Sequence, residues 1–365
     1  MVKFTPIWAL GLMSGTSLDG VDGAMVLTDG QDILDFGASF FRPYSEHEHA
    51  ILRDALGLWP DGDATRLQLA KSIVEDAHAD VIAHFPTADV VGFHGQTLAH
   101  DPAGGRTFQI GDGAALASET GKKVVWDFRT ADMAAGGEGA PLAPFFHFAL
   151  AKQLGGTQPI AFLNLGGVGN VTWIDPSKGL PTDAGALLAF DTGPANAPIN
   201  DLMVLRTNST FDEDGAHALA GHVDTGVLEV FFKHDYFERV PPKSLDRNDF
   251  AQIENLVSNL SLEDGAATLT ALAASSAYAA QMHFPNDPAR WLICGGGRRN
   301  PALMNGLQQR LKQVAPCEDV GFDGDMLEAQ AFAYLAVRVM RGLATSAPST
   351  TGCSEPVCGG IISNP

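Results

Sequence analysis

The chain of 365 residues is 45% hydrophobic and 18% charged, and its formal net charge at pH 7 is −20. This length is enough for about two ordinary domains, and the composition is that of a globular protein with an ample core. The strong negative charge argues against nucleic acid or an anionic membrane surface as the partner. No run reaches the roughly 18 apolar residues that a membrane span needs.

The cysteines and the amino terminus bear on the cellular compartment. Cys294, Cys317, Cys353 and Cys358 form no paired CxxC or zinc-binding pattern, so we expect free thiols and a cytoplasmic protein. The alternative is export, because the apolar stretch after Lys3 resembles a short signal peptide. Pro6 interrupts that stretch and no small-residue cleavage site follows, so we do not expect export.

Strand and helix patterns alternate along the chain. Before a loop at 131–144, we expect strands at 7–13, 23–28, 89–95 and 122–129 and helices at 46–58 and 64–85. After it, we expect a helix at 144–154, a strand–turn–strand unit at 159–174, a strand ending at Asp191 with a helix to 204, a helical region at 249–282, a strand–turn–helix unit at 291–311 and a helix at 327–343.

One device occurs in both halves of the chain: a strand, a glycine-rich polar turn and a second strand, at 10–27 and again at 159–174. This repetition predicts two similarly built α/β domains that face each other across a cleft. We place the first domain at 1–134 and the second at 135–342, and residues 343–365 could pack back onto the first.

The first glycine-rich turn carries hydroxyls and carboxylates as well as glycines. Backbone N–H groups and hydroxyls can hold phosphate oxygens, glycines allow close approach, and a carboxylate can hold Mg²⁺ through water. Taken by itself, the segment is better explained as an ordinary polar hairpin loop. No GxxxxGK[ST] phosphate loop occurs anywhere in the chain, and no GxGxxG follows any of the expected strands.

Two further glycine-rich turns could hold an anion. NLGGVGN (164–170) offers backbone groups only, and an ordinary hairpin explains it equally well. CGGGRRNP (294–301) leads from a strand to a helix start, where amide groups attract negative charge. A flexible connection is the alternative for that turn.

Several polar residues at element ends are candidates for chemistry. Asp191 follows an apolar strand, although many such aspartates only cap a helix or stabilise a turn. Arg129 could pair with a substrate carboxylate, or with Asp127 or Asp132 in an ordinary salt bridge. The segment with His94, Gln96 and Thr97 ends another strand, and a structural histidine is its alternative. Glu328 begins an apolar helix, where an acid also favours the helix dipole.

Taken together, the motifs resemble a known family. Three glycine-rich cradles without a phosphate-loop lysine are similar to the sugar kinase/Hsp70/actin superfamily, in which ATP lies between two ribonuclease-H-like domains. GLMSGTSLDGVD, HGQT, DFR with Asp132, GGEGAPLAP, NLGGVGN, FDTGPAN, PPKS, CGGGRRNP and DMLEAQAFAYLA resemble the anhydro-N-acetylmuramic acid kinase family, in the same order, from about residue 8 to about residue 360.

The resemblance implies a fold, an activity and site residues. The expected enzyme splits the 1,6-anhydro bridge of anhydro-N-acetylmuramic acid with water and phosphorylates O6 from ATP with Mg²⁺, in cell-wall recycling. It implies Asp191 as the general base and Glu328 as a second catalytic carboxylate, His94, Gln96 and Arg129 as sugar-binding residues, and a homodimer. The implied ATP-binding residues are Gly15, Thr16, Ser17, Leu18, Asp19, Gly20, Val21, Asp22, Gly166, Gly167, Gly295, Gly296 and Gly297.

The sequence departs from the family pattern in two places. Ala195 stands where the family usually has glycine, and LDRNDF (245–250) replaces the string that usually follows PPKS. Either change could reshape a turn or the pocket. Two other functions remain open at this point: an ATP-dependent conformational switch of the actin or Hsp70 kind, and a kinase for a different sugar.

Overall fold

The chain folds into two compact units, here called unit 1 and unit 2. The computed structural model describes residues 4–245, 250 and 253–365. Unit 1 comprises Met1–Gly155 and Met326–Pro365, and unit 2 comprises Gly156–Asp325. The expected boundary at 134/135 therefore differs from the division at 155/156, and the helix expected at 327–343 belongs to unit 1. Residues 246–249 of the LDRNDF stretch lie outside the described residues.

Unit 1 is built on a seven-stranded sheet. Its order is β12-β6-β4-β1-β2-β3, and β5 pairs with β4. Strands β1 to β3 form an antiparallel meander, β4 and β6 run parallel to β1, and β12 is antiparallel to β6. The strands are β1 Ile7–Ser14, β2 Gly20–Thr28, β3 Ile33–Pro43, β4 Val90–Asp101, β5 Arg106–Ile110, β6 Val124–Trp126 and β12 Ile361–Ser363.

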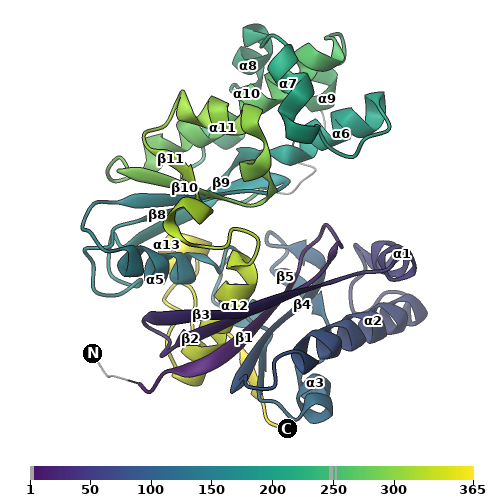
Figure 1. Cartoon of the computed structure of the whole chain (residues 1–365), viewed down its shortest axis with the longest axis vertical. Helices are drawn as coiled ribbons and strands as arrows, with labels where there is room; N and C mark the ends of the chain where they lie inside the picture. Colours follow the sequence, from purple (N-terminus) through teal and green to yellow (C-terminus); the bar gives the residue numbers. More distant parts are fainter. Residues whose placement is uncertain (1–3, 246–249, 251–252) are drawn as a thin grey trace. The chain divides into compact units, whose positions relative to one another are not determined.

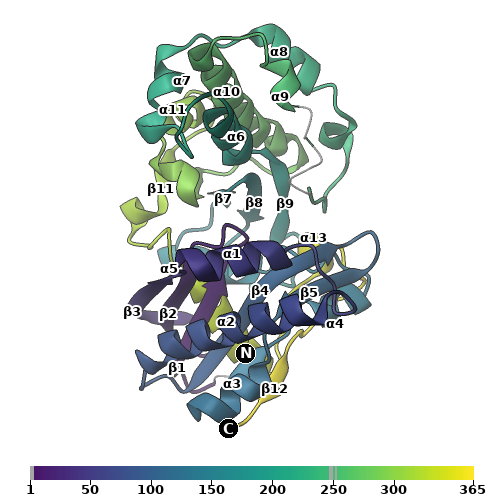
Figure 2. The same ribbon diagram turned by 90° about the vertical axis from the view of Figure 1, so that its right-hand side faces the viewer.

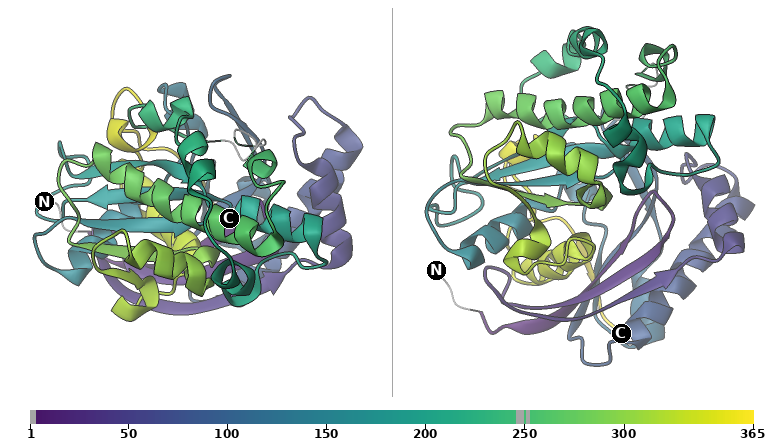
Figure 3. Two further views of the ribbon diagram at one scale, coloured as in Figure 1. Left: turned by 90° about the horizontal axis from the view of Figure 1, so that it is seen from above. Right: turned by 45° about the horizontal axis from the view of Figure 1, so that its top comes forward.

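Helices cover both faces of this sheet, with α2 on one side and α12 on the other (Figure 3). The helices are α1 Glu46–Ala55, α2 Ala64–Ala83, α3 Gly113–Thr120, α4 Thr130–Ala134, α5 Pro144–Leu154, α12 Leu327–Met340 and α13 Pro348–Thr351. Leu10 and Leu12 point from β1 into the core under α2, together with Val74 and Val81 of that helix. Because side chains alternate along a strand, Gly11 points to the opposite face.

Two glycines let α12 lie directly on the strands. A Cβ on Gly11 would stand 1.7 Å from the carbonyl oxygen of Ala329, and a Cβ on Gly92 would stand 2.1 Å from that of Phe332. No side chain fits at either position, so the backbone of α12 touches β1 and β4. This contact is the physical reason why the carboxyl-terminal helix belongs to unit 1 rather than to the second half of the chain.

Unit 2 repeats the sheet plan of unit 1 with five strands. The strands are β7 Ile160–Leu165, β8 Val168–Ile174, β9 Leu187–Pro194, β10 Arg290–Cys294 and β11 Val314–Pro316. Their order is β11-β10-β7-β8-β9, with β7 to β9 antiparallel and β10 and β11 parallel to β7 (Figure 1). Both units thus consist of a three-stranded meander followed by two parallel strands, which confirms the predicted ribonuclease-H-like α/β class. The predicted cleft stays a prediction.

Most of the helical part of unit 2 lies between β9 and β10 in the sequence. The helices are α6 Asn196–Arg206, α7 Ala216–Ala220, α8 Thr225–Phe231, α9 Ile253–Leu256, α10 Leu262–Ala280 and α11 Pro301–Gln308. Short 3-10 turns occupy Glu213–Gly215, Asp235–Glu238, Gln281–His283, Gly296–Arg299 and Cys317–Val320. The long buried helix α10 packs against α6, α7 and α11 (Figure 2).

Three expected boundaries were wrong. β2 begins at Gly20, so the first glycine-rich turn is shorter than expected. The helical region expected at 249–282 holds two separate helices within its described part, because Ser261 caps a new start at α10. β9 runs to Pro194 and does not stop at Asp191. None of the helices that the structure describes has the length and apolarity to span a membrane.

Candidate functional site

The turn between β1 and β2 of unit 1 presents hydroxyls at its tip and a buried anchor at its base. Thr16 and Ser17 are exposed, and their side chains make no hydrogen bond within the described part of the chain. Leu18 is 2% exposed, adopts a positive φ of 60° and donates its N–H to the carbonyl of Gly15 at 3.1 Å. A chain folded in this way can offer N–H groups and hydroxyls to phosphate oxygens.

Gln96 supports this turn from below. Its side chain is fully buried, accepts a hydrogen bond from the Ser14 hydroxyl at 2.5 Å and donates to the carbonyl of Gly15 at 3.2 Å. The Tyr44 hydroxyl lies 3.0 Å from that of Ser14. The structure therefore places Gln96 behind the predicted phosphate turn and not on the cavity described next, although the sequence predicted it as a sugar contact.

His94 and Arg129 form a pair at the carboxyl end of the strands of unit 1. Arg129 approaches the His94 Nε2 atom with Nε at 3.1 Å and Nη2 at 2.9 Å, and its Nη1 donates to the carbonyl of Gly139 at 2.6 Å. Arginine only donates, so Nε2 accepts and the imidazole proton sits on Nδ1, which faces the carbonyl of Gly95 at 2.8 Å. Arg129 makes no salt bridge with Asp127 or Asp132, so the alternative raised from the sequence is wrong.

Burial sets the charges of this pair. It holds the pKa of His94 well below the usual value, and the Arg129 cation adds to that effect. Burial also lowers the pKa of Arg129 to about 10, against the opposing effect of the carboxylates Glu328 and Asp132. At neutral pH the pair therefore consists of a neutral imidazole and a charged guanidinium.

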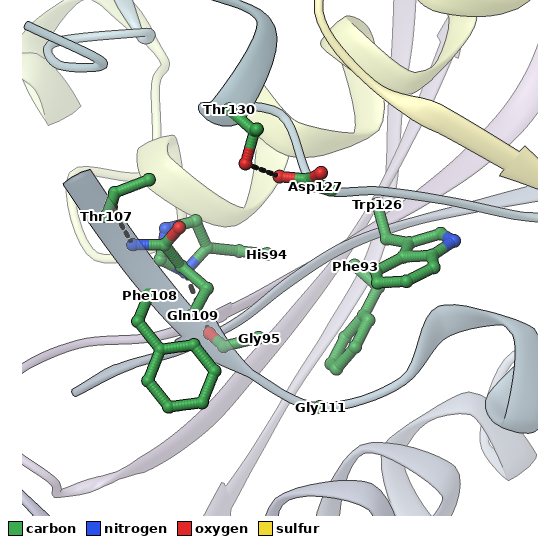
Figure 4. A pocket seen from close by; sticks show the side chains of 10 residues that line it. All are labelled: Phe93, His94, Gly95, Thr107, Phe108, Gln109, Gly111, Trp126, Asp127 and Thr130. Carbon is green, nitrogen blue, oxygen red and sulfur yellow. Dashed lines mark hydrogen bonds between the residues drawn. The ribbon is translucent and has the colours of Figure 1, made fainter. Parts of the chain in front are cut away.

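A cavity of about 180 Å³ opens beside His94 (Figure 4). Its polar wall includes Gln109, whose amide donates to Thr97 at 3.1 Å and to Thr107 at 2.7 Å, and Asp127, which accepts from Thr130 at 2.5 Å. Its apolar wall is formed by Phe93, Phe108 and Trp126. Aromatic faces beside amide, hydroxyl and carboxylate groups suit a sugar-sized ligand.

Asp127 is a strained residue at the edge of this cavity. It follows β6 directly and has a φ of 54°, which a residue with a side chain rarely adopts. Strain of this kind persists where the surrounding structure fixes it, and such positions are concentrated at functional sites. From the sequence, Asp127 was expected only as a possible salt-bridge partner of Arg129. Thr107 and Gln109 were not predicted as site residues, because they lie on the short strand β5, where no strand was expected.

Asp132 fastens the loop behind Arg129. Its carboxylate is fully buried and accepts from the N–H of Gly139 at 2.8 Å, from the hydroxyl of Thr351 at 2.7 Å and from that of Ser346. Both backbone polar groups of Gly139 are therefore hydrogen-bonded, the N–H to Asp132 and the carbonyl to Arg129. The carboxyl-terminal segment of the chain consequently helps to orient the guanidinium.

Glu328 occupies the first turn of α12 and is exposed. It lies one residue before Ala329, whose carbonyl marks the close contact of α12 with Gly11. The same glycine contact that seats α12 on the sheet therefore fixes the position of the Glu328 backbone within unit 1. The negative charge of Glu328 raises the pKa of Arg129 and so opposes the effect of burial.

In unit 2 the hairpin turn Gly166–Gly167 receives the start of α6. The carbonyl of Gly166 accepts from the N–H of Asn196 at 3.0 Å, and that of Gly167 accepts from the N–H of Ala195 at 2.9 Å. Ala195 is 2% exposed, so its methyl group is buried at the start of α6. The residue that departs from the family pattern therefore lies where the hairpin turn meets α6.

The triple glycine after β10 contains two packed positions and one open position. A Cβ on Gly295 would lie 2.2 Å from Asn164 Oδ1, and one on Gly297 would lie 2.6 Å from the Cβ of Leu165. A Cβ on Gly296 would meet nothing within 4 Å. Arg298 holds the turn by donating to the carbonyl of Gly295 at 3.0 Å and pairing with Asp325 at 3.0 Å. Gly296 alone thus leaves room for a ligand at this turn.

Asp191 lies within β9 beside an irregular position. Asn170 pairs with Asp191 and Gly169 with Gly193, so Thr192 is the extra residue of a β-bulge. Bulges redirect side chains and are frequent beside active sites. The Asp191 carboxylate accepts from the N–H of Leu245 at 2.8 Å. Ala195 and not Asp191 precedes α6, so the helix-cap alternative for Asp191 is wrong.

Known proteins include relatives that match this chain over its whole length. Residues 7–365 match a family model described as "Anhydro-N-acetylmuramic acid kinase". Relatives with that name are 57% identical in Roseobacter denitrificans, covering 100% of this chain and 96% of the relative, and 58% identical in Cereibacter sphaeroides, covering 100% and 98%. Among solved structures, the activator of 2-hydroxyisocaproyl-CoA dehydratase from Clostridium difficile with bound ADPNP has a TM-score of 0.42 and 14% identity, covering 92% of this chain and 96% of that one.

Proposed function

The chain belongs to the anhydro-N-acetylmuramic acid kinase family, and we propose that it opens the 1,6-anhydro ring of anhydro-N-acetylmuramic acid with water and phosphorylates O6 from ATP. The product is N-acetylmuramic acid 6-phosphate, an intermediate in the recycling of cell-wall peptidoglycan. The observation that carries this proposal is the identity of 57–58% to relatives of that name over the whole chain.

We assign the hydrolytic step to Asp191 as general base. Its carboxylate takes a proton from water as the water oxygen bonds to C1, the C1–O6 bond breaks, and the O6 electron pair attacks the γ-phosphorus of ATP, so that ADP leaves. Glu328 is the second carboxylate of this proposal and helps to position the water. A positioned base typically contributes about 10²–10⁴-fold in rate. The Leu245 N–H keeps the Asp191 carboxylate oriented.

We assign ATP to the glycine-rich turns. The support is the exposed hydroxyls of Thr16 and Ser17 and the open space at Gly296. Mg²⁺ would supply charge neutralisation at the phosphates, and it commonly uses one or two carboxylates with several waters. Asp19 fits this requirement, because it is exposed and makes no side-chain hydrogen bond in the described part of unit 1.

We assign the sugar to the cavity beside His94. Arg129 is not among the residues that line this cavity, but it contacts His94, which does line it. Its Nε, Nη2 and Nη1 make internal bonds, and both terminal nitrogens keep N–H groups for a carboxylate such as the lactyl group of the substrate. We further propose a cytoplasmic homodimer. None of the four cysteines, all of which the structure describes, forms a disulfide, which is compatible with a reducing compartment.

The direct test is an assay with ATP, Mg²⁺ and the anhydro sugar. We expect the wild-type protein to release the 6-phosphate and ADP in equal amounts, and we expect Asp191→Asn to lose about 10²–10⁴-fold in kcat. Absence of product from the wild-type protein would refute the proposed function. Full activity in Asp191→Asn would refute the assignment of the base.

The rival functions predict different products. An actin-like or Hsp70-like switch would turn over ATP at the same rate with and without sugar. A kinase for another sugar would leave the anhydro sugar intact and phosphorylate a glucose-like or N-acetylated hexose offered in its place.

A further inference from the structure

Lys243, which lies in the PPKS motif, has no role in the mechanism above. We propose that Lys243 is a positioning residue for Asp191: its ammonium group holds Tyr236, and its main chain holds the backbone of Asp191. The inference rests on the proposed role of Asp191 as general base.

Two segments hold three different groups of Asp191. The N–H of Asp191 donates to the carbonyl of Lys243 at 3.0 Å, and the N–H of Leu245 donates to the Asp191 carboxylate at 2.8 Å. From the other segment, the Tyr236 hydroxyl donates to the carbonyl of Asp191. The backbone and the side chain of Asp191 are therefore fixed from residues 243–245 and from Tyr236.

The Lys243 side chain joins these two segments. Its Nζ donates to the carbonyl of Tyr236 at 3.1 Å and lies 4.5 Å from the centre of the Tyr236 ring. It also lies 5.7 Å from the ring of Phe190, the residue before Asp191. Cation–π attraction to both rings keeps Tyr236, Phe190 and the 243–245 segment together. Without the ammonium group, the two segments that orient Asp191 would lose this connection.

The charge itself argues for a functional role. Lys243 is 4% exposed, and in the described part of the chain its ammonium group meets a carbonyl and two aromatic rings, so burial of this cation is costly unless those contacts stabilise the charge. Apolar side chains of similar length would fill the space without that cost. A cation at this position is thus poorly explained by packing, whereas its hydrogen bond and its ring contacts explain it as a device that orients Asp191.

The surroundings of Lys243 also predict a pH signature. Among the residues that the structure describes, the ionisable groups near its ammonium group are His283 at 3.3 Å, Arg239 and Tyr236, while Asp191 meets Lys243 through the backbone. Burial, with a smaller effect of Arg239, lowers the pKa of Lys243 to about 8, below its ordinary value of 10.5. Between these two values the unfolded chain binds more protons than the folded chain, so this group makes folding more favourable as pH rises. Activity that needs the cation falls over the same range.

The test compares Lys243→Met with Lys233→Met, an exposed lysine of the same unit, in the sugar kinase assay from pH 6 to about 10. We expect Lys243→Met to lose about 10- to 100-fold in kcat, as for a misplaced base, with little change in KM for the sugar. Its Tm should equal or exceed that of the wild type, and the decline of kcat above about pH 8 should disappear. Lys233→Met should behave as the wild type does.

A second variant tests whether Lys243 acts through Tyr236. Tyr236→Phe removes the hydroxyl that holds the Asp191 carbonyl, so it should also lower kcat. The double variant should be no slower than the slower single variant, because both changes break one connection.

Several results would overturn the inference. An unchanged kcat in Lys243→Met would contradict it, and so would a lower Tm of that variant with the pH profile of the wild type. Failure of Lys243→Met to fold would also contradict it, as would a double variant whose loss in kcat is the product of the two single losses. An inactive wild-type protein would instead overturn the proposed function.

Discussion

At the scale of single residues, the buried carboxylate of Asp132 connects the loop at Gly139 to the carboxyl-terminal segment of unit 1. It binds the hydroxyls of Ser346 and Thr351 and the N–H of Gly139, while the carbonyl of Gly139 binds Arg129. Its negative charge also opposes the lowering of the Arg129 pKa. Asp132 therefore helps to fix the position of Arg129, the predicted sugar-binding arginine, through Gly139.

Replacing Asp132 by asparagine tests this arrangement. The amide would direct N–H groups toward at least one existing donor, and we expect the free energy of unfolding to fall by about 1–3 kcal/mol. We also expect a higher KM for the sugar, because Gly139 no longer holds Arg129. Urea titration and initial-rate kinetics measure the two effects. Glu119→Gln, at an exposed position of the same unit, is the matched control, and equal stability of the two variants would contradict the expectation.

At the scale of elements, two glycines of the turn after β10 differ in their roles, because Gly297 is packed against its neighbours and Gly296 faces open space. Gly297→Ala places a Cβ 2.6 Å from that of Leu165, whereas Gly296→Ala places one in open space. We expect Gly297→Ala to lower Tm by several degrees. We expect Gly296→Ala to keep the wild-type Tm and to raise KM for ATP about 10-fold or more, since a methyl group would stand where the nucleotide approaches. An unchanged KM for ATP in Gly296→Ala would remove this turn from the proposed nucleotide site.

The elements that the sequence predicted well share a clear signal. The helix pattern at 64–85 became α2, and the strand–turn–strand pattern at 159–174 became β7 and β8. The edge strand β3 was not expected, because most of its side chains are exposed and its hydrophobic alternation is weak. The end of β9 was misjudged because Thr192 and Gly193 resemble a turn, whereas in the structure they form a bulge.

The residues of the candidate site also divide into those that a local sequence pattern predicts and those that only the fold brings together. Motifs next to strands indicated His94, Arg129 and Asp191. The position of Gln96 behind the phosphate turn depends on the pairing of β1 with β4, which joins residues 82 apart in sequence. No local pattern reports a contact at that separation. A role for Lys243 or Tyr236 was not predicted for the same reason, because only the folded chain brings these residues to Asp191.

At the scale of the whole molecule, the two units differ in how the chain forms them. Unit 2 is one continuous segment, Gly156–Asp325, whereas unit 1 needs α12 and β12 from the end of the chain. We expect a fragment of residues 156–325 to show cooperative thermal unfolding by circular dichroism. We expect a fragment of residues 1–155 to show none, because the face of β1 and β4 with Gly11 and Gly92 would be uncovered. Cooperative unfolding of the 1–155 fragment would contradict this.

The seating of α12 on Gly11 and Gly92 also has a consequence during protein synthesis. A ribosome releases β1 to β6 of unit 1 long before residues 327–340 emerge, and at about 5–20 residues per second the delay is on the order of ten seconds or more. During that interval the face of β1 and β4 that α12 later covers stays exposed, whereas unit 2 can already fold. We therefore expect the nascent chain to bind chaperones that shield exposed apolar surface, and slow translation of the last 40 residues to prolong that binding.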